Sequence, residues 1–174
     1  MSNPTPPPQR QQDIVIRRAI KGDASAIVKV HYDAVHVTAG KDYDQSILDD
    51  WSALPFDRVE RLETQIEDNP ENTIMIVAET AGEIVGFGEI APDNSELRAV
   101  YVSPSAGRKA VGKAILHELE TLARELGVLE LWLDSSLTAE PFYLAQGYLR
   151  DGQAEHQLRS GRKMLCIKMH KRWT

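Results

Sequence analysis

The stretch VSPSAGRKAVGKA, residues 102–114, decides how the whole chain is interpreted, because it joins an alternating apolar pattern to a helical one. Alanine and glycine fill five of its last nine positions, so backbone N–H groups can approach a ligand closely. Arg108, Lys109 and Lys113 place three positive charges within six residues. The unpaired N–H groups of a first helical turn favour an anion, and the stretch therefore predicts a phosphate-binding turn. A basic, glycine-bearing turn without a ligand is the alternative.

Three consecutive strands are predicted directly before this turn. Residues 73–79 and 83–90 are rich in β-forming side chains and are joined by a short turn, which indicates an antiparallel hairpin, and residues 96–102 add a third strand. Gly86 and Gly88 lie inside the second strand, where glycine often marks a close backbone approach or a bulge. An ordinary irregularity of an edge strand is the alternative.

The remaining elements follow from apolar spacing and from turn residues. Asp23 is a candidate N-cap for the first helix, and Pro55 breaks the second helical region into two pieces. Gly127 and Gly147 are typical of residues that follow a helix. The predicted strands are residues 13–19, 73–79, 83–90, 96–102, 128–133 and a closing pair within 148–172, and the helices are 23–36, 44–51 with 56–67, 111–126 and 138–145. The order β-α-α-β-β-β-α-β-α-β-β predicts an α/β fold with one sheet.

Composition limits the classes of protein that remain. A chain of 174 residues suits one domain, with 42% hydrophobic and 26% charged residues and no stretch apolar enough for a membrane span. The net charge of −6 disfavours nucleic acid and anionic membranes as partners. A single cysteine, Cys166, excludes a disulfide framework, and the five histidines are too scattered for a metal site. We expect residues 1–12, which are polar and rich in proline, to be a disordered leader of a cytoplasmic protein whose domain spans residues 13–174.

One nucleotide-binding pattern overlaps the same turn. Residues 107–113 spell G-x-x-x-x-G-K, the body of a P-loop. The next residue, Ala114, has no hydroxyl for Mg²⁺, and antiparallel strands before the loop do not suit a parallel P-loop sheet. A P-loop nucleotide-binding protein is therefore the weaker alternative.

Residues 96–127 resemble the acyl-CoA-binding motif of the GNAT N-acetyltransferase superfamily, whose loop reads Q/R-x-x-G-x-G/A. The pattern falls on Gly107, Ala110 and Gly112, so the first position lacks Gln or Arg and the second has alanine in place of glycine. Alanine is small enough to keep the backbone amides accessible, and Arg108 and Lys109 are available to replace the missing side chain.

A second segment resembles the same superfamily independently. The sequence SLTAEPFYLAQGY, residues 136–148, is similar to the pattern N-x-x-A-x-x-x-Y-x-x-x-G-F, with Ser136 in place of Asn and Tyr148 in place of Phe. With the order of elements, the resemblance extends over about residues 14–169 and points to an uncharacterised bacterial subgroup. It implies a GNAT-like mixed, mostly antiparallel sheet flanked by helices.

The resemblance also implies a reaction, in which an acetyl group passes directly from acetyl-CoA to a primary amine. Such transfer needs a base for the ammonium and an acid for the leaving thiolate. Tyr143 matches the acid of the family and Glu96 a position where some members carry the base, while Glu89 is a rival inside a strand. Packing of Tyr143 against the sheet, with its hydroxyl bonded locally, is the alternative to a catalytic role. The implied cofactor-binding set is Val100, Val102, Gly107, Arg108, Lys109, Ala110, Val111, Gly112, Lys113, Ala114, Ser136 and Tyr143.

The acceptor is expected between the first helical region and the sheet. His36, Trp51 and Glu89 are the candidate substrate-binding residues, and His31 in the same region is a candidate proton relay or a buried helix position. The acidic residues between 42 and 50 hint at a cationic acceptor, although such a run is usually a solvated helix face.

Two points stay open in the sequence. The altered signature positions leave a non-catalytic acyl-CoA-binding sensor as the main alternative to an enzyme. The expected partner is a small-molecule or peptide amine, and the closing strands offer an edge through which a homodimer can form.

Overall fold

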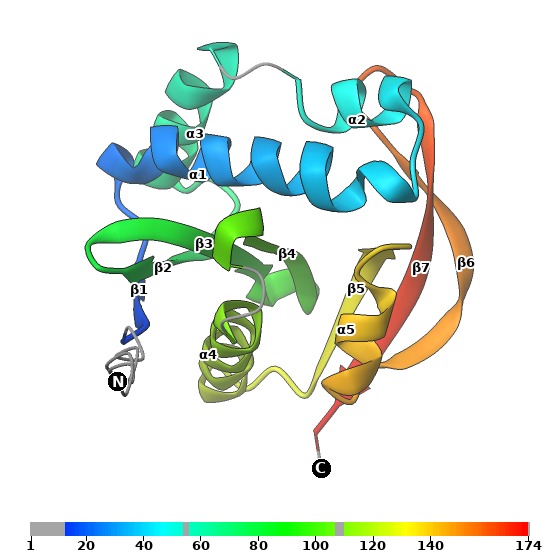
Figure 1. Ribbon diagram of the computed structural model, residues 1–174. Coiled ribbons are helices and arrows are strands. Elements are labelled where there is room, and N and C mark those ends of the chain that lie inside the picture. The colour runs from blue at the N-terminus through cyan, green and yellow to red at the C-terminus, as the bar shows by residue number, and fades with distance from the viewer. Residues whose placement is uncertain (1–12, 54–55, 107–109, 174) are drawn as a thin grey trace, which may run out of the picture.

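A computed structural model describes residues 13–53, 56–106 and 110–173. One mixed, mostly antiparallel sheet of seven strands has the order β1-β2-β3-β4-β5-β7-β6 (Figure 1). The strands are β1 (Val15–Arg18), β2 (Ile74–Thr80), β3 (Glu83–Ala91), β4 (Glu96–Val102), β5 (Glu130–Ser136), β6 (Leu149–Gln157) and β7 (Lys163–Arg172). This arrangement confirms the predicted fold class.

Helices cover both faces of the sheet. Helices α1 (Ala24–Asp33) and α3 (Phe56–Asp68) pack on one face, α4 (Val111–Glu125) packs on the other, and α5 (Glu140–Ala145) lies beside β5 (Figure 1). Helix α2 (Gln45–Trp51) lies near the turn between β6 and β7. The core follows this division, since one apolar cluster gathers around α4 and another between α1, α3 and the sheet. Among the residues that the structure describes, no helix has the length and apolar character that a bilayer span requires.

Two details of the first helix differ from the prediction. The α-helix ends at Asp33 and continues as a π-helical segment, Ala34–Thr38. Asp23 stands at the N-cap position of α1 but does not cap it, because its carboxylate accepts a hydrogen bond from the N–H of Ile20 at 2.8 Å and pairs with Arg17 at 2.7 Å. The proposed break at Leu54 and Pro55 lies outside the described residues.

The parallel pair β4 and β5 is joined over very little of its length. Only Glu96 and Trp132 are in register, and the described residues show no further pairing between the two strands. The edge of β4 that faces β5 is therefore unpaired beyond its first residue. A P-loop protein needs an extended parallel sheet at this point, so the P-loop alternative is wrong.

Gly86 and Gly88 allow α4 to approach the sheet. A Cβ atom on Gly88 would lie 2.6 Å from Ile115 Cγ2 and 2.9 Å from the carbonyl oxygen of Ala99, and Gly86 is nearly as crowded. The predicted close approach is confirmed. The edge-strand alternative is wrong because β3 pairs with a strand on each side. Bulges also occur nearby, since Val85 has no partner on β2 and Arg98 has none on β3.

This crowding predicts a stability effect. We expect Gly88→Ala to lower the free energy of unfolding by about 1–3 kcal/mol, because the new methyl group would push on α4 and on a backbone carbonyl. Gly22→Ala is the matched control, since a Cβ there meets nothing within 4 Å. Urea unfolding of both variants measures the difference, and an equal effect at the two positions would contradict this account of β3.

Candidate functional site

The first turn of α4 offers backbone N–H groups to an anion. The helix begins after Ala110, whose φ of 59° is left-handed, and no side chain of the described residues caps this end. Ala114 N–H donates to the Ala110 carbonyl at 3.0 Å. The amides of residues 111–113 precede it and have no hydrogen-bond acceptor among the described residues. Together with the positive end of the helix dipole, these amides make surroundings that favour a phosphate. Gly107, Arg108 and Lys109 of the predicted turn lie outside the described residues.

The surroundings of this turn also suit a bound ligand. Gly112 has no side chain, and a Cβ at its position would lie 3.5 Å from Val102 and 3.6 Å from Phe142. Val100 and Val102 belong to β4 and pack on the α4 side of the sheet. Their strand has an unpaired edge toward β5, where amide groups of a ligand can add to the sheet in the manner of another strand. The predicted residues of β4 and α4 are thus neighbours in space.

Tyr143 projects from α5 into the protein interior. Its side chain is only 6% exposed, and its ring contacts Phe142 and Tyr148 at centroid distances of 5.1 and 5.5 Å. Burial raises the pKa of Tyr143 well above its usual value, and the Tyr101 phenol raises it further. The hydroxyl therefore stays protonated at neutral pH. It makes no hydrogen bond to any described residue, so the local bond expected of a purely packing tyrosine is not observed.

The two candidate carboxylates lie in different surroundings. Glu96 begins β4 beside Trp132, and its carboxylate accepts a hydrogen bond from Arg98 Nε at 3.0 Å. Five residues of extended chain separate it by roughly 15 Å from Tyr101 at the other end of the strand. Glu89 is buried on the α3 face, where Gln65 donates to it at 3.3 Å. Burial raises the pKa of Glu89 above its usual value.

A cluster of aromatic and polar side chains fills the space between α1, α2 and β4. The rings of His31 and Tyr101 lie edge to face at 4.5 Å, and Trp51 packs against both. Ser52 Oγ lies 2.7 Å from His31 Nδ1, and Arg58 Nη1 donates to His31 Nδ1 at 3.1 Å and to Ser52 Oγ at 3.0 Å. With donors around it, Nδ1 must be an unprotonated acceptor.

Burial is also the main cause that lowers the pKa of His31 to about 3, with Arg58 adding to the effect. His31 therefore remains neutral at physiological pH. Burial likewise raises the pKa of Tyr101 to about 12, so both groups keep one protonation state near neutrality. The structure places His31 as a buried helix residue and gives it no role as a relay that charges and discharges near pH 7.

A hollow of about 500 Å³ borders this cluster, between α3 and the turn that joins β6 to β7. Trp51 lines it, whereas His36 does not and instead lies with Nε2 2.8 Å from the Ser52 carbonyl, to which it donates. Glu89 is one side chain removed from the hollow, behind Gln65. Of the three candidate substrate-binding residues, the structure therefore brings only Trp51 to this hollow.

Ser136 and Tyr43 hold the β5–α5 connection in place. Ser136 Oγ accepts a hydrogen bond from the N–H of Ala139 at 3.1 Å, so it fixes the turn before α5. The Tyr43 hydroxyl donates to the Leu165 carbonyl at 2.8 Å and accepts from the Leu137 N–H at 2.8 Å. These bonds tie α5, and with it Tyr143, to the segment before α2.

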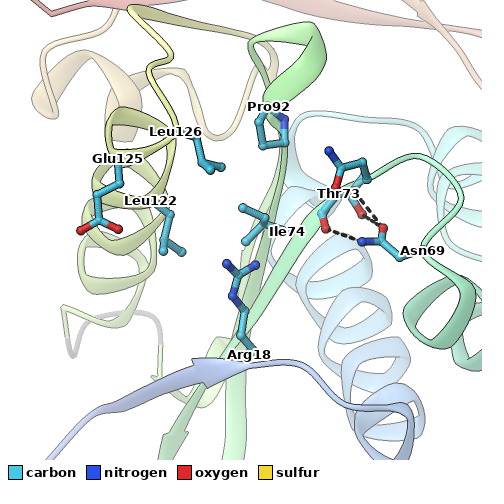
Figure 2. Close-up of a pocket in the computed structure, with 9 residues that line it drawn as sticks. Arg18, Asn69, Thr73, Ile74, Pro92, Leu122, Glu125 and Leu126 are labelled. Atoms are coloured by element: carbon cyan, nitrogen blue, oxygen red, sulfur yellow. Dashed lines mark hydrogen bonds between the residues drawn. The ribbon is translucent and has the colours of Figure 1, made fainter.

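A second hollow, of about 360 Å³, lies at the far end of α4 between Leu122, Ile74 and Arg18 (Figure 2). A helix of this length puts it roughly 20 Å from the first turn of α4. None of the site residues predicted from the sequence lines this second hollow. Among the described residues there is also no group of three or more His, Cys, Asp or Glu side chains that would hold a metal ion.

Sequence reasoning missed Arg58 and Tyr101. Tyr101 lies in a predicted strand, but only the pairing with Phe87 shows that it faces the α1 side. The sequence contains a weak signal for Arg58, since residues 58, 61 and 65 form a polar stripe beside the apolar face of α3. Nothing in the sequence placed that stripe against Ser52 and His31.

The left-handed Ala110 predicts a stabilising substitution. An alanine in this conformation costs about 1 kcal/mol or more, whereas glycine adopts it freely. Glycine also loses more chain entropy on folding than alanine does, and this loss offsets part of the gain. Ala110→Gly should therefore raise the free energy of unfolding by up to about 1 kcal/mol. Ala114→Gly, inside the helix, should lower it by about 1 kcal/mol. Thermal or urea unfolding that shows both variants destabilised equally would contradict the observed start of α4.

Comparison with known proteins supports the interpretation of the fold. Residues 41–171 match the sequence profile of the acetyltransferase (GNAT) domain. A comparison with curated proteins gave no match. Among solved structures, a GCN5-related N-acetyltransferase from Rhodopseudomonas palustris has a TM-score of 0.79 and 22% identity, covering 91% of this chain and 95% of that one.

Two other structures contain a cofactor. The PaiA N-acetyltransferase from Thermoplasma acidophilum, solved with coenzyme A, has a TM-score of 0.69 and 21% identity over 92% of this chain and 99% of that one. The acetyltransferase yncA from Salmonella typhimurium, solved with acetyl-CoA, has a TM-score of 0.65 and 22% identity over 92% and 94%. These likenesses establish the shared fold. Because the family profile spans well over half of its length, the chain belongs to the GNAT acetyltransferase family.

Proposed function

We propose that this protein transfers an acetyl group from acetyl-CoA directly to a primary amine. The observation that carries the proposal is the uncapped first turn of α4, which lies beside the unpaired edge of β4. Tyr143 belongs to the apolar cluster against which Val100 and Val102 of the same strand pack. An anion site, an open strand edge and a buried acid together suit a cofactor with a diphosphate, an amide-containing arm and a thioester.

Individual residues can be assigned to each part of acetyl-CoA. The amides of Val111, Gly112 and Lys113 would hold the diphosphate, with residues 107–109 and Ala114 completing the turn. The backbone of Val100 and Val102 would bind the pantetheine arm. Ser136 would support the arm from the other side through the turn that it fixes. PaiA and yncA, which were solved with coenzyme A and acetyl-CoA, support this assignment by their shared fold.

When bound, acetyl-CoA supplies an activated acetyl group. The amine nitrogen forms the new bond to the acetyl carbon, the carbon–sulfur bond breaks, and the sulfur takes the electron pair. Tyr143 donates the proton that the sulfur needs, since its raised pKa keeps it protonated until that moment. A base must first remove a proton from the ammonium, because only the neutral amine attacks.

Glu96 and Glu89 are the two candidates for that base. Glu96 lies where β4 and β5 meet, but Arg98 already engages its carboxylate. Glu89 is buried near the hollow, and its raised pKa would make it a stronger base than an ordinary carboxylate. Glu96→Gln and Glu89→Gln distinguish them, because only loss of the true base lowers kcat/KM steeply and removes the acidic limb of its pH profile.

Thiol release from acetyl-CoA across a panel of primary amines tests the proposed reaction. We expect release that depends on the amine, with a product heavier by one acetyl group. Tight coenzyme A binding with no release for any amine would favour the non-catalytic acyl-CoA-binding module instead.

A further inference from the structure

The hollow between α3 and the β6–β7 turn has a charge opposite to that of the whole protein. Arg58, Arg61 and Arg159 line it, and Asp50 is the one carboxylate among its described lining residues, while the chain carries a net charge of −6. The Asp50 carboxylate already has partners within the protein, because Ser160 donates a hydrogen bond to it and Arg162 lies 3.9 Å away. The remaining titratable group among the lining residues that the structure describes is His156, which lies 3.4 Å from Asp134.

Arg58 is held in place for binding. Both of its described hydrogen bonds leave from Nη1, toward His31 and Ser52. Its Nε and Nη2 donors have no acceptor among the residues that the structure describes, and neither Arg61 nor Arg159 forms an ion pair there. An arginine fixed at one nitrogen presents its remaining donors with little further loss of side-chain entropy. Burial, followed by the charge of Arg61, lowers the pKa of Arg58, so an anion placed here would relieve an unfavourable cluster of cations.

The hollow adjoins one candidate base of the proposed reaction, because its lining residue Gln65 donates to Glu89 at 3.3 Å. Trp51 also lines the hollow and packs on Tyr101 of β4. The hollow lies on the α1 and α3 side of the sheet, whereas the anion site of α4 lies on the other side. A volume of about 500 Å³ suits a small molecule.

We propose that the acceptor is a small amine with a separate anionic group, which binds Arg58, Arg61 and Arg159 in this hollow. The inference rests on the proposed acetyl transfer and adds the class of acceptor. Carboxylate and phosphonate share the required chemistry, since arginine binds both through paired N–H groups. Two further acidic residues that hinted at a cationic acceptor already accept hydrogen bonds, as Asp50 does: Thr138 donates to Asp42 at 2.6 Å and Gln45 to Asp49 at 2.7 Å.

Matched amine pairs test the acceptor class. With saturating acetyl-CoA at low salt, we expect β-alanine to have a kcat/KM at least about tenfold above that of β-alanine amide, and 2-aminoethylphosphonate to exceed ethanolamine similarly. The first pair reports a carboxylate and the second a phosphonate. The double variant Arg61→Gln/Arg159→Gln should lose most of this preference, because both side chains are exposed and can change without disturbing the core. Arg162→Gln, in the same turn but paired with Asp50, should keep it.

A binding measurement separates this inference from the acetyl transfer itself. Calorimetry of the coenzyme A complex with N-acetyl-β-alanine and its amide needs no turnover. We expect the carboxylate to bind at least about tenfold more tightly, and the double variant to abolish the difference. Equal or absent binding of the two would overturn the acceptor class, whether or not other amines are acetylated. Selective binding without any turnover would uphold the anionic site and contradict only the transfer reaction.

Discussion

Tyr143→Phe is expected to lower kcat by about 100- to 10 000-fold while the affinity for coenzyme A changes little. The substitution removes only the hydroxyl that would protonate the leaving sulfur, and loss of a general acid typically costs this much. The ring would still fill its place against Phe142 and Tyr148, so the fold should be kept. Single-turnover thiol release measures the chemical step directly.

Tyr148→Phe is the matched control for this variant. The Tyr148 hydroxyl is buried and has no hydrogen-bond partner among the described residues, so its removal should leave turnover intact and should not destabilise the protein. Equal rates for wild type and Tyr143→Phe would show that Tyr143 only packs α5 onto the sheet. Equal losses in both variants would point to a general effect on the aromatic cluster.

Acid is expected to destabilise the protein through His31. The ordinary pKa of histidine is 6.5, and in the fold it falls to about 3. Between these values the unfolded chain binds a proton that the folded chain does not, so stability is lost as the pH falls below 6.5. This one group should cost about 2 kcal/mol between pH 8 and pH 5.

Urea unfolding at several pH values tests this effect. His31→Gln should remove this part of the pH dependence, because glutamine accepts a hydrogen bond without taking up a proton. The His31 ring signal in an NMR titration should stay constant down to about pH 4. A midpoint near pH 6.5 would contradict the buried neutral histidine and would restore the proton-relay hypothesis.

Periodicity and turn residues were enough to predict most of the sheet. Strand β3 and helix α4 have strong alternating and helical patterns, and Gly127, with a φ of 82°, ends α4 as expected. Asp23 shows where local rules fail. Its carboxylate pairs with Arg17 instead of capping α1, and Arg17 is held in position by the pairing of β1 with β2. Such competition depends on tertiary contacts that no local pattern contains.

The two sides of the site differed in how far the sequence could predict them. The anion-binding turn is a contiguous stretch that its small and basic residues indicated, and Tyr143 was indicated by the resemblance of residues 136–148 to a family pattern. Arg58, Ser52 and His31 meet only because α1, the end of α2 and α3 converge over the sheet. Arg159 joins them from a turn about a hundred residues later in the chain. Sequence spacing cannot predict a pocket assembled from such distant segments.

Gly112→Asp provides the most direct test of the central claim, which is that the first turn of α4 binds the diphosphate of coenzyme A. An aspartate in the first turn of a helix favours folding, and the site has room for its Cβ, but its charge would repel the diphosphate. Gly112→Asn is the uncharged control of the same shape. Calorimetry should show coenzyme A bound at least about tenfold more weakly by Gly112→Asp than by Gly112→Asn. Equal affinities in two folded variants would place the diphosphate elsewhere and contradict the account.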